Sequence, residues 1–101
     1  MIQLIESEKY TNWLEKLRDV NGRSRINARI DRLACGLTGD SKSVGGGVFE
    51  LRIDCGPGYR IYYMWRGKEL IVLLAGGDKS SQVKDINVAK KLAEQYSKEN
   101  R

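Results

Sequence analysis

Apolar residues follow a helical period in three stretches of the chain. In the first, from Glu8 to about Val20, they recur every three or four positions, at Tyr10, Trp13, Leu14 and Leu17. Asn21 and Gly22 are expected to end this helix, because both tolerate the left-handed conformation of a helix cap. A second helix is predicted from about Arg23 to Cys35, with the stripe Ile26, Ile30, Leu33 and Leu37. A third begins near Ser80 or Ser81 and carries the weaker stripe Val83, Ile86, Ala89, Ala93 and Tyr96.

Four other stretches have the pattern of β-strands. Met1 to Ser7 alternates weakly, residues 49–54 and 59–66 alternate clearly, and residues 70–74 form the unbroken apolar run typical of a central strand. Gly76-Gly77 is expected to end the last strand. The order strand-helix-helix-strand-strand-strand-helix predicts one α+β domain over residues 1–101. We expect two layers, with the helices on one face of an antiparallel meander and the other face partly in solvent.

Composition narrows the chemistry open to such a domain. The chain has 101 residues, 41% hydrophobic and 31% charged, without an apolar run long enough to cross a bilayer or a signal-peptide pattern. It has no histidine, which excludes Ser-His-Asp and Cys-His nucleophile systems and the usual base near neutral pH. Cys35 and Cys55 are too few for a disulfide framework or a zinc site and are interpreted as ordinary half-buried thiols.

The charge balance suggests an anionic partner. Eighteen Lys and Arg against thirteen Asp and Glu give a net charge of +5. A small domain this basic is a candidate for binding a polyanion or an acidic protein, although a basic surface also serves solubility alone.

Pleat alternation collects charged groups on the sheet face that we expect to be open. If Leu51 and Ile61 face the helices, then Glu50, Arg52, Arg60 and Tyr62 are cross-strand neighbours on the other side. Two guanidiniums match phosphate oxygens, a carboxylate can take a proton from a ribose 2′-hydroxyl, and a phenol ring can stack on a base. The alternative interpretation is an ordinary cross-strand salt bridge without function.

Two glycine-rich segments are weaker candidates for anion binding. Gly76-Gly77 is followed by Asp78, Lys79 and two serines, and Gly45-Gly46-Gly47 is preceded by Lys42. Neither has the spacing of a P-loop. An ordinary glycine turn with an N-cap is the favoured interpretation of the first segment, and a flexible loop is that of the second.

Three motifs together resemble the toxins of RelE/ParE-type toxin–antitoxin modules. They are Lys42-Ser43-Val44-Gly45-Gly46-Gly47-Val48-Phe49-Glu50-Leu51-Arg52-Ile53, Gly56-Pro57-Gly58-Tyr59-Arg60-Ile61-Tyr62-Tyr63 and Leu73-Leu74-Ala75-Gly76-Gly77-Asp78-Lys79-Ser80. The branch that this chain resembles most is the HigB-like "addiction module killer protein", and the resemblance covers essentially the whole chain. It implies a microbial-ribonuclease-like fold. It also implies cleavage of mRNA in the ribosomal A site by attack of the 2′-hydroxyl, leaving a 2′,3′-cyclic phosphate without a metal or organic cofactor.

The resemblance assigns roles residue by residue. Arg60 matches the arginine that stabilises the transition state in RelE-like members, and Arg52 matches the basic residue on the preceding strand. Lys79 stands where relatives place a basic residue after the last strand, as a phosphate contact or proton donor. Glu50 has no assured counterpart, so its role as a base depends on the pleat alone. With these four as catalytic candidates, RNA binding is assigned to Lys42, Tyr62, Arg66 and Lys68.

Three functions follow from this interpretation. The first is a cytoplasmic, ribosome-dependent mRNA endonuclease that binds the 70S ribosome and mRNA. It is neutralised by a helix-turn-helix antitoxin and meets operator DNA only through that antitoxin. The second is a ParE-like inhibitor of DNA gyrase that binds without cleaving. The third is a basic RNA-binding domain without catalysis.

Overall fold

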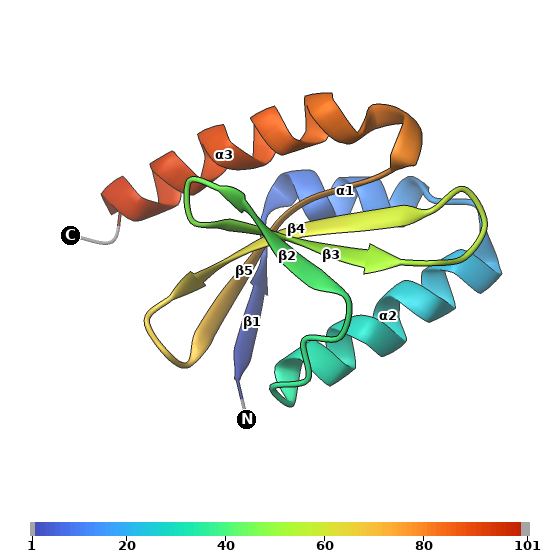
Figure 1. Ribbon diagram of the computed structural model, residues 1–101, viewed down its shortest axis with the longest axis horizontal. Coiled ribbons are helices and arrows are strands. Elements are labelled where there is room, and N and C mark those ends of the chain that lie inside the picture. Colours follow the sequence, from blue (N-terminus) through green and yellow to red (C-terminus); the bar gives the residue numbers. More distant parts are fainter. Residues whose placement is uncertain (1, 100–101) are drawn as a thin grey trace.

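A computed structural model of the protein describes residues 2–99, with the side chain of residue 99 excluded. It contains five strands, three helices and a short 3₁₀ turn. In chain order these are β1 (Gln3–Glu6), α1 (Glu8–Lys16), α2 (Val20–Ala34), β2 (Ser41–Gly45), β3 (Val48–Ile53), β4 (Tyr59–Arg66), β5 (Leu70–Asp78), η1 (Lys79–Ser81) and α3 (Gln82–Glu99) (Figure 1). The α+β class, the predicted helices and the antiparallel meander are confirmed. Met1, at the start of the predicted first strand, lies outside the described residues.

The strands form one sheet in the order β1-β5-β4-β3-β2. β1 pairs parallel to β5, and all other neighbours are antiparallel. The parallel pair follows from the two helices that connect β1 to the meander, which carry the chain back across the sheet. The central strands β4 and β5 therefore have partners on both sides, as the apolar run of residues 70–74 predicts.

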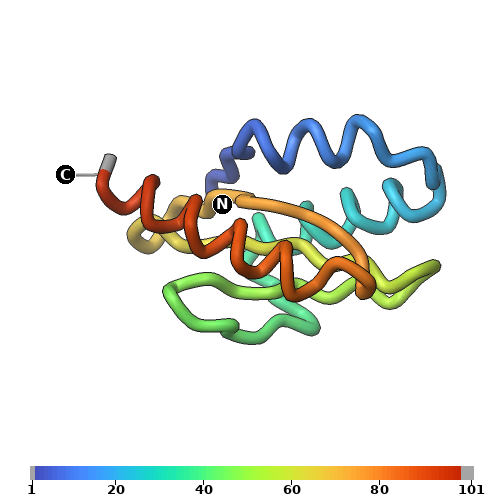
Figure 2. The backbone as a smooth tube through the Cα atoms, turned by 90° about the horizontal axis from the view of Figure 1, so that it is seen from above, coloured from blue at the N-terminus to red at the C-terminus, as the bar shows by residue number. Residues whose placement is uncertain are grey.

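Helices cover both faces of this sheet. On one face, α1 and α2 pack against Leu51, Ile61 and Leu73. On the other face, α3 packs Ala89 and Ala93 against Tyr62, Val72 and Leu74. Seen from above, α3 runs along the sheet between α1 and the β2–β3 hairpin (Figure 2). The expectation that all helices lie on one face and leave the other open is therefore wrong, because α3 returns over the face that carries Tyr62.

The boundary between the first two helices differs from the prediction. α1 ends at Lys16, and Asn21 and Gly22 lie inside α2 instead of ending α1. Asp19 is the N-cap of α2, since its carboxylate accepts a hydrogen bond from the Gly22 amide at 3.0 Å. A Cβ on Gly22 would approach both Asp19 and Tyr59 within 2.6 Å, so glycine is needed there for packing and not for a C-cap.

Two further differences concern the strands. Residues 41–45, predicted as loop, form the edge strand β2, whose polar side chains give no strand signal because most are exposed. Gly76 and Gly77 lie inside β5 and do not end it. A Cβ on Gly77 would lie 1.9 Å from a carboxylate oxygen of Asp85 on α3, so the missing side chain lets helix and strand meet. Among residues 2–99, none of the helices combines the length and apolarity that crossing a membrane requires.

Candidate active site

At one end of the sheet, β3 ends, β4 begins and β5 leads into α3 (Figure 1). Each of these three segments carries a basic residue there. Arg52 on β3 is paired in register with Arg60 on β4, and Arg60 is paired with Gly77 on β5. Lys79 follows β5 at once, in η1. The three cations Arg52, Arg60 and Lys79 are called the basic cluster below.

The guanidinium of Arg60 has a hydrogen-bond donor without a partner among the described residues. Its side chain is buried, and Nη1 donates to the carbonyl of Tyr59 at 3.2 Å. Nε is buried without a hydrogen-bond partner in the described part of the chain. A buried guanidinium with an unused donor is costly unless a ligand supplies the acceptor.

Lys79 lies beside Arg60 because the turn between β3 and β4 comes close to both. A Cβ atom on Gly58 would lie 3.7 Å from Nη1 of Arg60 and 3.7 Å from Cβ of Lys79. Gly58 has φ +82°, a backbone conformation that favours glycine, so the turn supplies backbone without a side chain between the two cations.

Glu50 is the centre of a saturated hydrogen-bond network. It is fully buried, and its Oε1 accepts from Nε of Arg52 at 3.0 Å. Its Oε2 accepts from the hydroxyl of Tyr62 at 3.2 Å and from Nε2 of Gln82 at 2.7 Å. Gln82, the first residue of α3, thus joins the helix to the sheet directly beneath Arg52.

The network keeps Glu50 ionised. Burial alone would raise the pKa of this carboxyl, but hydrogen bonds from Gln82, Arg52 and Tyr62, together with the Arg52 charge, outweigh it and hold the pKa below its usual range. Burial, and then the neighbouring Glu50 charge, raise the pKa of Tyr62 far above neutrality, so the phenol stays protonated and donates to Glu50. A carboxylate with a low pKa and three donors is a poor proton acceptor at neutral pH.

These positions correct two of the predicted roles. Glu50 and Tyr62 are on the predicted sheet face, but both are completely buried under α3. Tyr62 therefore has no exposed ring on which a base could stack, and its assignment to RNA binding is wrong. Glu50 has no open path to a ribose hydroxyl, so the expected base is a partner of Arg52 instead.

The other RNA-binding candidates are divided between two places. Lys42 on the edge strand β2 is paired in register with Glu50, so it is exposed on the same face and close to the basic cluster. Arg66 and Lys68 are at and beyond the opposite end of β4 from Arg60, six or more residues away and thus about 20 Å distant. The guanidinium of Arg66 lies 5.9 Å from the ring centroid of Tyr96, which gives it a structural contact with α3.

The site contains more positive than negative side chains, which favours an anionic ligand. Within the described residues, the one ion pair is Arg52–Glu50, and Arg60 and Lys79 have no carboxylate within 4 Å. Arg52 and Arg60 are like charges directly opposite on neighbouring strands, and Glu50 compensates only the first of them. Two guanidinium groups and an ammonium group at one end of the sheet suit a phosphodiester, whose charge they would neutralise.

Gln82 is the member of this site that sequence reasoning missed. It sits at the start of a helix, where glutamine is an ordinary helix former, and its contact with Glu50 spans 32 positions of the chain. Only the placement of α3 over the face of Glu50 reveals it.

Comparison with known proteins shows the family to which the chain belongs. The sequence model described as "Phage derived protein Gp49-like (DUF891)" matches residues 12–98, which is most of the chain. The chain belongs to the phage-derived Gp49-like family. An uncharacterized protein of Haemophilus influenzae is 50% identical over 94 residues, which cover 93% of this chain and 95% of the relative.

A solved structure shares the fold of this Gp49-like protein. The Escherichia coli toxin RelE, as a double mutant in the free state, is similar with a TM-score of 0.65 over 85% of this chain and 95% of that chain. The two sequences are 17% identical, so the likeness establishes the fold. The fold that the resemblance to RelE/ParE-type toxins implies is thus confirmed, and the family shown is the phage-derived Gp49-like one.

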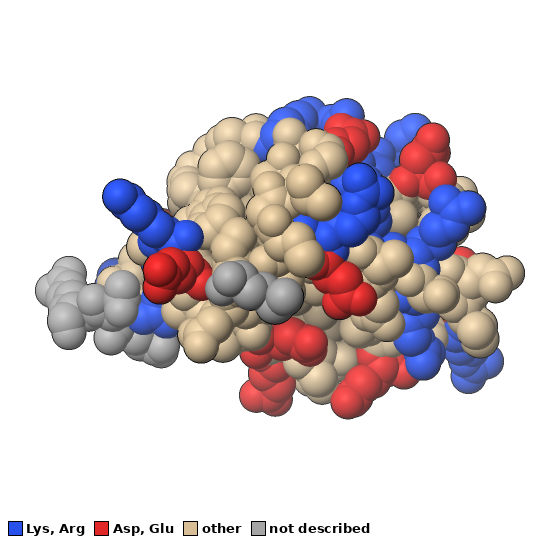
Figure 3. All heavy atoms as spheres, turned by 90° about the horizontal axis from the view of Figure 1, so that it is seen from below, with Lys and Arg blue, Asp and Glu red and all other residues tan. Residues whose placement is uncertain are grey.

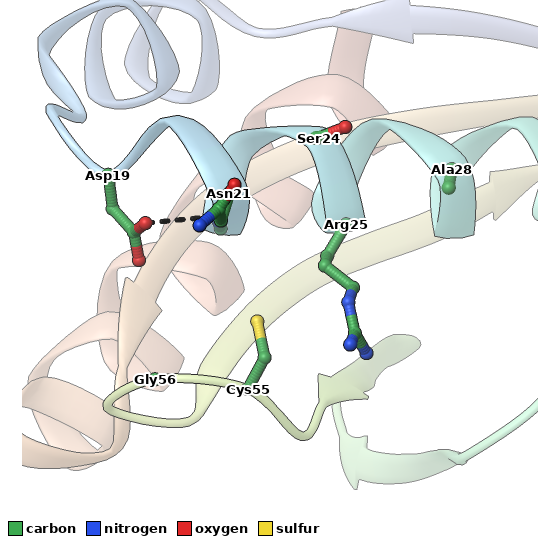
Figure 4. Close-up of a pocket in the computed structure, with 8 residues that line it drawn as sticks. Asp19, Asn21, Ser24, Arg25, Ala28, Cys55 and Gly56 are labelled. Carbon is green, nitrogen blue, oxygen red and sulfur yellow. Dashed lines mark hydrogen bonds between the residues drawn. The ribbon is translucent and has the colours of Figure 1, made fainter.

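A hollow elsewhere in the Gp49-like protein differs in charge from the basic cluster. It has a volume of about 600 Å³ and lies at the start of α2, where Asp19, Arg25 and Cys55 line it (Figure 4). Hydrogen bonds from Tyr59, and then from the Gly22 amide, hold the pKa of Asp19 below its usual range. The hollow therefore contains an ionised carboxylate, which would repel a polyanion. The hydrogen bonds of Asp19 connect the start of α2 to the start of β4.

Another face of the molecule carries charges of both signs. On the face turned away from α3, acidic and basic side chains lie side by side (Figure 3). Such a face gives a polyanion no continuous attraction. Within the described residues, the basic cluster differs from that face because two of its three cations, Arg60 and Lys79, have no carboxylate within 4 Å.

Proposed function

We propose that this Gp49-like protein is the toxin of a toxin–antitoxin module and acts as a metal-independent endoribonuclease. Family membership and the RelE-like fold support the toxin. The observation that carries the nuclease is the basic cluster, in which Arg60 and Lys79 have no carboxylate partner among the described residues. We take the substrate to be mRNA on the ribosome and the cell compartment to be the cytoplasm.

The reaction follows from where the charges lie. The ribose 2′-oxygen attacks the adjacent phosphorus, the bond from phosphorus to the 5′-oxygen breaks, and a 2′,3′-cyclic phosphate and a 5′-hydroxyl are formed. Arg60 and Arg52 bind the equatorial oxygens, whose negative charge grows in the transition state. Lys79 donates a proton to the leaving 5′-oxygen, and the proton of the 2′-hydroxyl goes to water.

Glu50 has a positioning role in this proposal. Its carboxylate fixes Nε of Arg52 and leaves the outer nitrogens of that guanidinium free for phosphate. Gln82 and Tyr62 hold the carboxylate in turn. Lys42, on the exposed edge of the same face, contacts the RNA backbone beside the cleavage site.

The partners follow from the same proposal. A helix-turn-helix antitoxin neutralises the protein and connects it to operator DNA, while the 70S ribosome presents the mRNA. The net charge of +5 favours association with ribosomal RNA phosphates.

Controlled expression in a growing bacterium tests the proposal. The wild-type chain should arrest growth, Arg60→Ala should abolish the arrest, and Arg32→Ala should retain it, because Arg32 is exposed on α2. A supercoiling assay with purified DNA gyrase is run alongside. Arrest that persists in Arg60→Ala together with inhibited supercoiling would overturn the nuclease in favour of a gyrase inhibitor.

A further inference from the structure

The first half of α3 presents an unusual outer surface. A hollow of about 790 Å³ runs along it, lined among others by Lys79, Val83, Lys84, Asn87, Val88 and Lys91. We call Val83, Val88, Lys79, Lys84 and Lys91 the valine–lysine surface. It lies on the side of α3 that faces away from the sheet, since none of its members belongs to the core beneath the helix.

Val83 is the most conspicuous member. The spacing of the chain predicts it as the first residue of the buried stripe of α3, but 76% of its surface is exposed. The stripe that packs on the sheet starts at Ile86 instead. An apolar side chain that is exposed beside a hollow adds nothing to folding and is available for a contact.

The charged residues that line this hollow are all of one sign. Lys84, Val88 and Lys91 are four and then three residues apart, which places them on one helix face, and Lys79 closes the hollow at the start of the helix. The residues that line the hollow include no Asp or Glu. Its surface therefore combines an apolar strip with a cationic border.

The cationic border continues toward α1. A smaller hollow between the two helices is lined by Lys9, Lys16 and Lys84, with Gly76 also contributing. Its one carboxylate, Asp85, accepts a hydrogen bond from the Ser81 hydroxyl at 2.6 Å. The positive potential thus extends over both sides of Lys84.

We infer that the valine–lysine surface is the docking site of an acidic, amphipathic peptide segment of a protein partner. Carboxylates of the segment would meet Lys84 and Lys91, and its apolar side chains would pack on Val83 and Val88. A single-stranded RNA fits less well, because such RNAs stack their bases on aromatic rings and the lining of this hollow contains none. Charge complementarity together with exposed valine selects the acidic peptide.

Docking here has a consequence that rests on the proposed function. Lys79 belongs both to the valine–lysine surface and to the basic cluster. A segment bound along α3 would engage Lys79 or cover it, and so remove the proton donor from the phosphodiester site. A protein partner could inhibit the enzyme in this way without entering the space between Arg52 and Arg60.

The test is a binding titration that needs neither RNA nor ribosomes. The probe is a fluorescent synthetic helix of leucine and glutamate, with leucines on one face. Two control peptides replace all glutamates with lysine or all leucines with glutamine. Fluorescence anisotropy gives the affinity for the full chain, and amide NMR shifts locate the contact. We expect the leucine–glutamate peptide to bind best and to shift residues 79–91.

Matched variants make the titration specific to the surface. Val83→Glu and Lys91→Glu should each weaken binding about tenfold or more, as for central contacts of an interface. Val20→Glu and Lys98→Glu are the controls, because Val20 is 74% exposed on α2 and Lys98 is exposed beyond the surface on α3. The controls should stay within about twofold.

Several results would overturn the inference. One is equal weakening by the surface variants and their controls, which would mean attraction by net charge alone. Another is no saturable binding of the leucine–glutamate peptide, or binding that survives loss of its leucines. A third is an RNA oligonucleotide shifting residues 79–91 while the peptide does not. Because no step measures cleavage, failure here leaves the nuclease proposal standing, and an inactive enzyme leaves the docking site testable.

Discussion

The buried carboxylate of Glu50, held by Gln82, positions Arg52 without itself reaching the candidate site. The carboxylate is buried, ionised and bonded to three donors, and one of them is the guanidinium that faces the candidate substrate. Removing a donor leaves a buried charge less well compensated, a change that affects both stability and the orientation of Arg52.

Gln82→Ala should lower the free energy of unfolding by about 1.5–3 kcal/mol, since it removes a hydrogen bond to a charged acceptor. Urea denaturation at pH 7 measures this, and RNA cleavage should slow because Arg52 is less firmly held. Gln95→Ala, an exposed glutamine of the same helix, should change stability by less than about 0.5 kcal/mol. Equal effects of the two changes would show that the contact with Glu50 contributes nothing.

The pH dependence of stability should report on Glu50. Its pKa is lower in the folded protein than in the unfolded chain, so the unfolded chain binds more protons in acid. This contribution to stability is present above the unfolded pKa of about 4.3 and is lost as pH falls through the lower, folded value. Asp19 and Asp78, whose pKa values are lowered too, contribute in the same direction.

The midpoint temperature of thermal unfolding, Tm, of the wild type should therefore fall steeply as the pH is lowered from about 5 to about 3. Glu50→Gln should be less stable at pH 7 but should lose less on acidification, because the group that titrates is gone. A wild-type profile with the same slope as that of Glu50→Gln would contradict an ionised, stabilising Glu50.

At the scale of elements, the junction of β5 and α3 determines the site. Gly77 is the register partner of Arg60, and Asp85 of α3 occupies the space that a side chain at Gly77 would need. The hydrogen bond from Ser81 to Asp85 then fixes the turn that carries Lys79. The spacing between Arg60 and Lys79 thus depends on this contact.

Gly77→Ala should lower the free energy of unfolding by about 1–3 kcal/mol, because the new methyl group would overlap Asp85. Gly77→Ala combined with Asp85→Ala should recover part of that loss, although Asp85→Ala alone destabilises by removing the Ser81 contact. A double-mutant cycle from urea denaturation measures the coupling. Strictly additive effects would mean that the two positions do not interfere.

Helices and strands could be predicted from the sequence wherever their apolar residues recur with a helical or a strand period. The alternation of Leu51 with Glu50 and of Ile61 with Arg60 predicts which face each occupies, and the register confirms it. The edge strand β2 was missed because an exposed polar strand has no apolar period. The α1–α2 boundary was misplaced because Gly22 signals a cap by its type but fills a packing role.

The candidate site, too, could be predicted only as far as local pattern determines it. Arg52, Arg60 and Lys79 could be predicted from pleat and motif, since cross-strand register brings the arginines together. The burial of Glu50 and Tyr62 could not, because it depends on which face of the sheet α3 returns to. A helix with small residues such as Ala89 and Ala93 packs closely on either face, so its stripe alone does not decide between them.

For the whole molecule, the excess positive charge should appear as salt-dependent RNA binding. The affinity for an RNA with all 2′-hydroxyls methylated, which prevents attack, should fall linearly with salt on logarithmic axes. Arg60→Ala and Lys79→Ala should each reduce the slope by about 0.7, the contribution of one phosphate contact in a single strand. Arg32→Ala should leave it unchanged. Identical slopes for all four proteins would place the RNA elsewhere.

The most direct measurement for the nuclease is primer extension on a defined mRNA in a reconstituted translation system, with and without ribosomes. We expect the wild type to cut at codon-phased positions only when ribosomes are present, and Arg60→Ala to leave the mRNA intact. Cuts without ribosomes would make the protein a free ribonuclease and contradict its dependence on the ribosome. Intact mRNA with the wild type under both conditions would contradict the nuclease itself and leave the basic cluster as a binding surface.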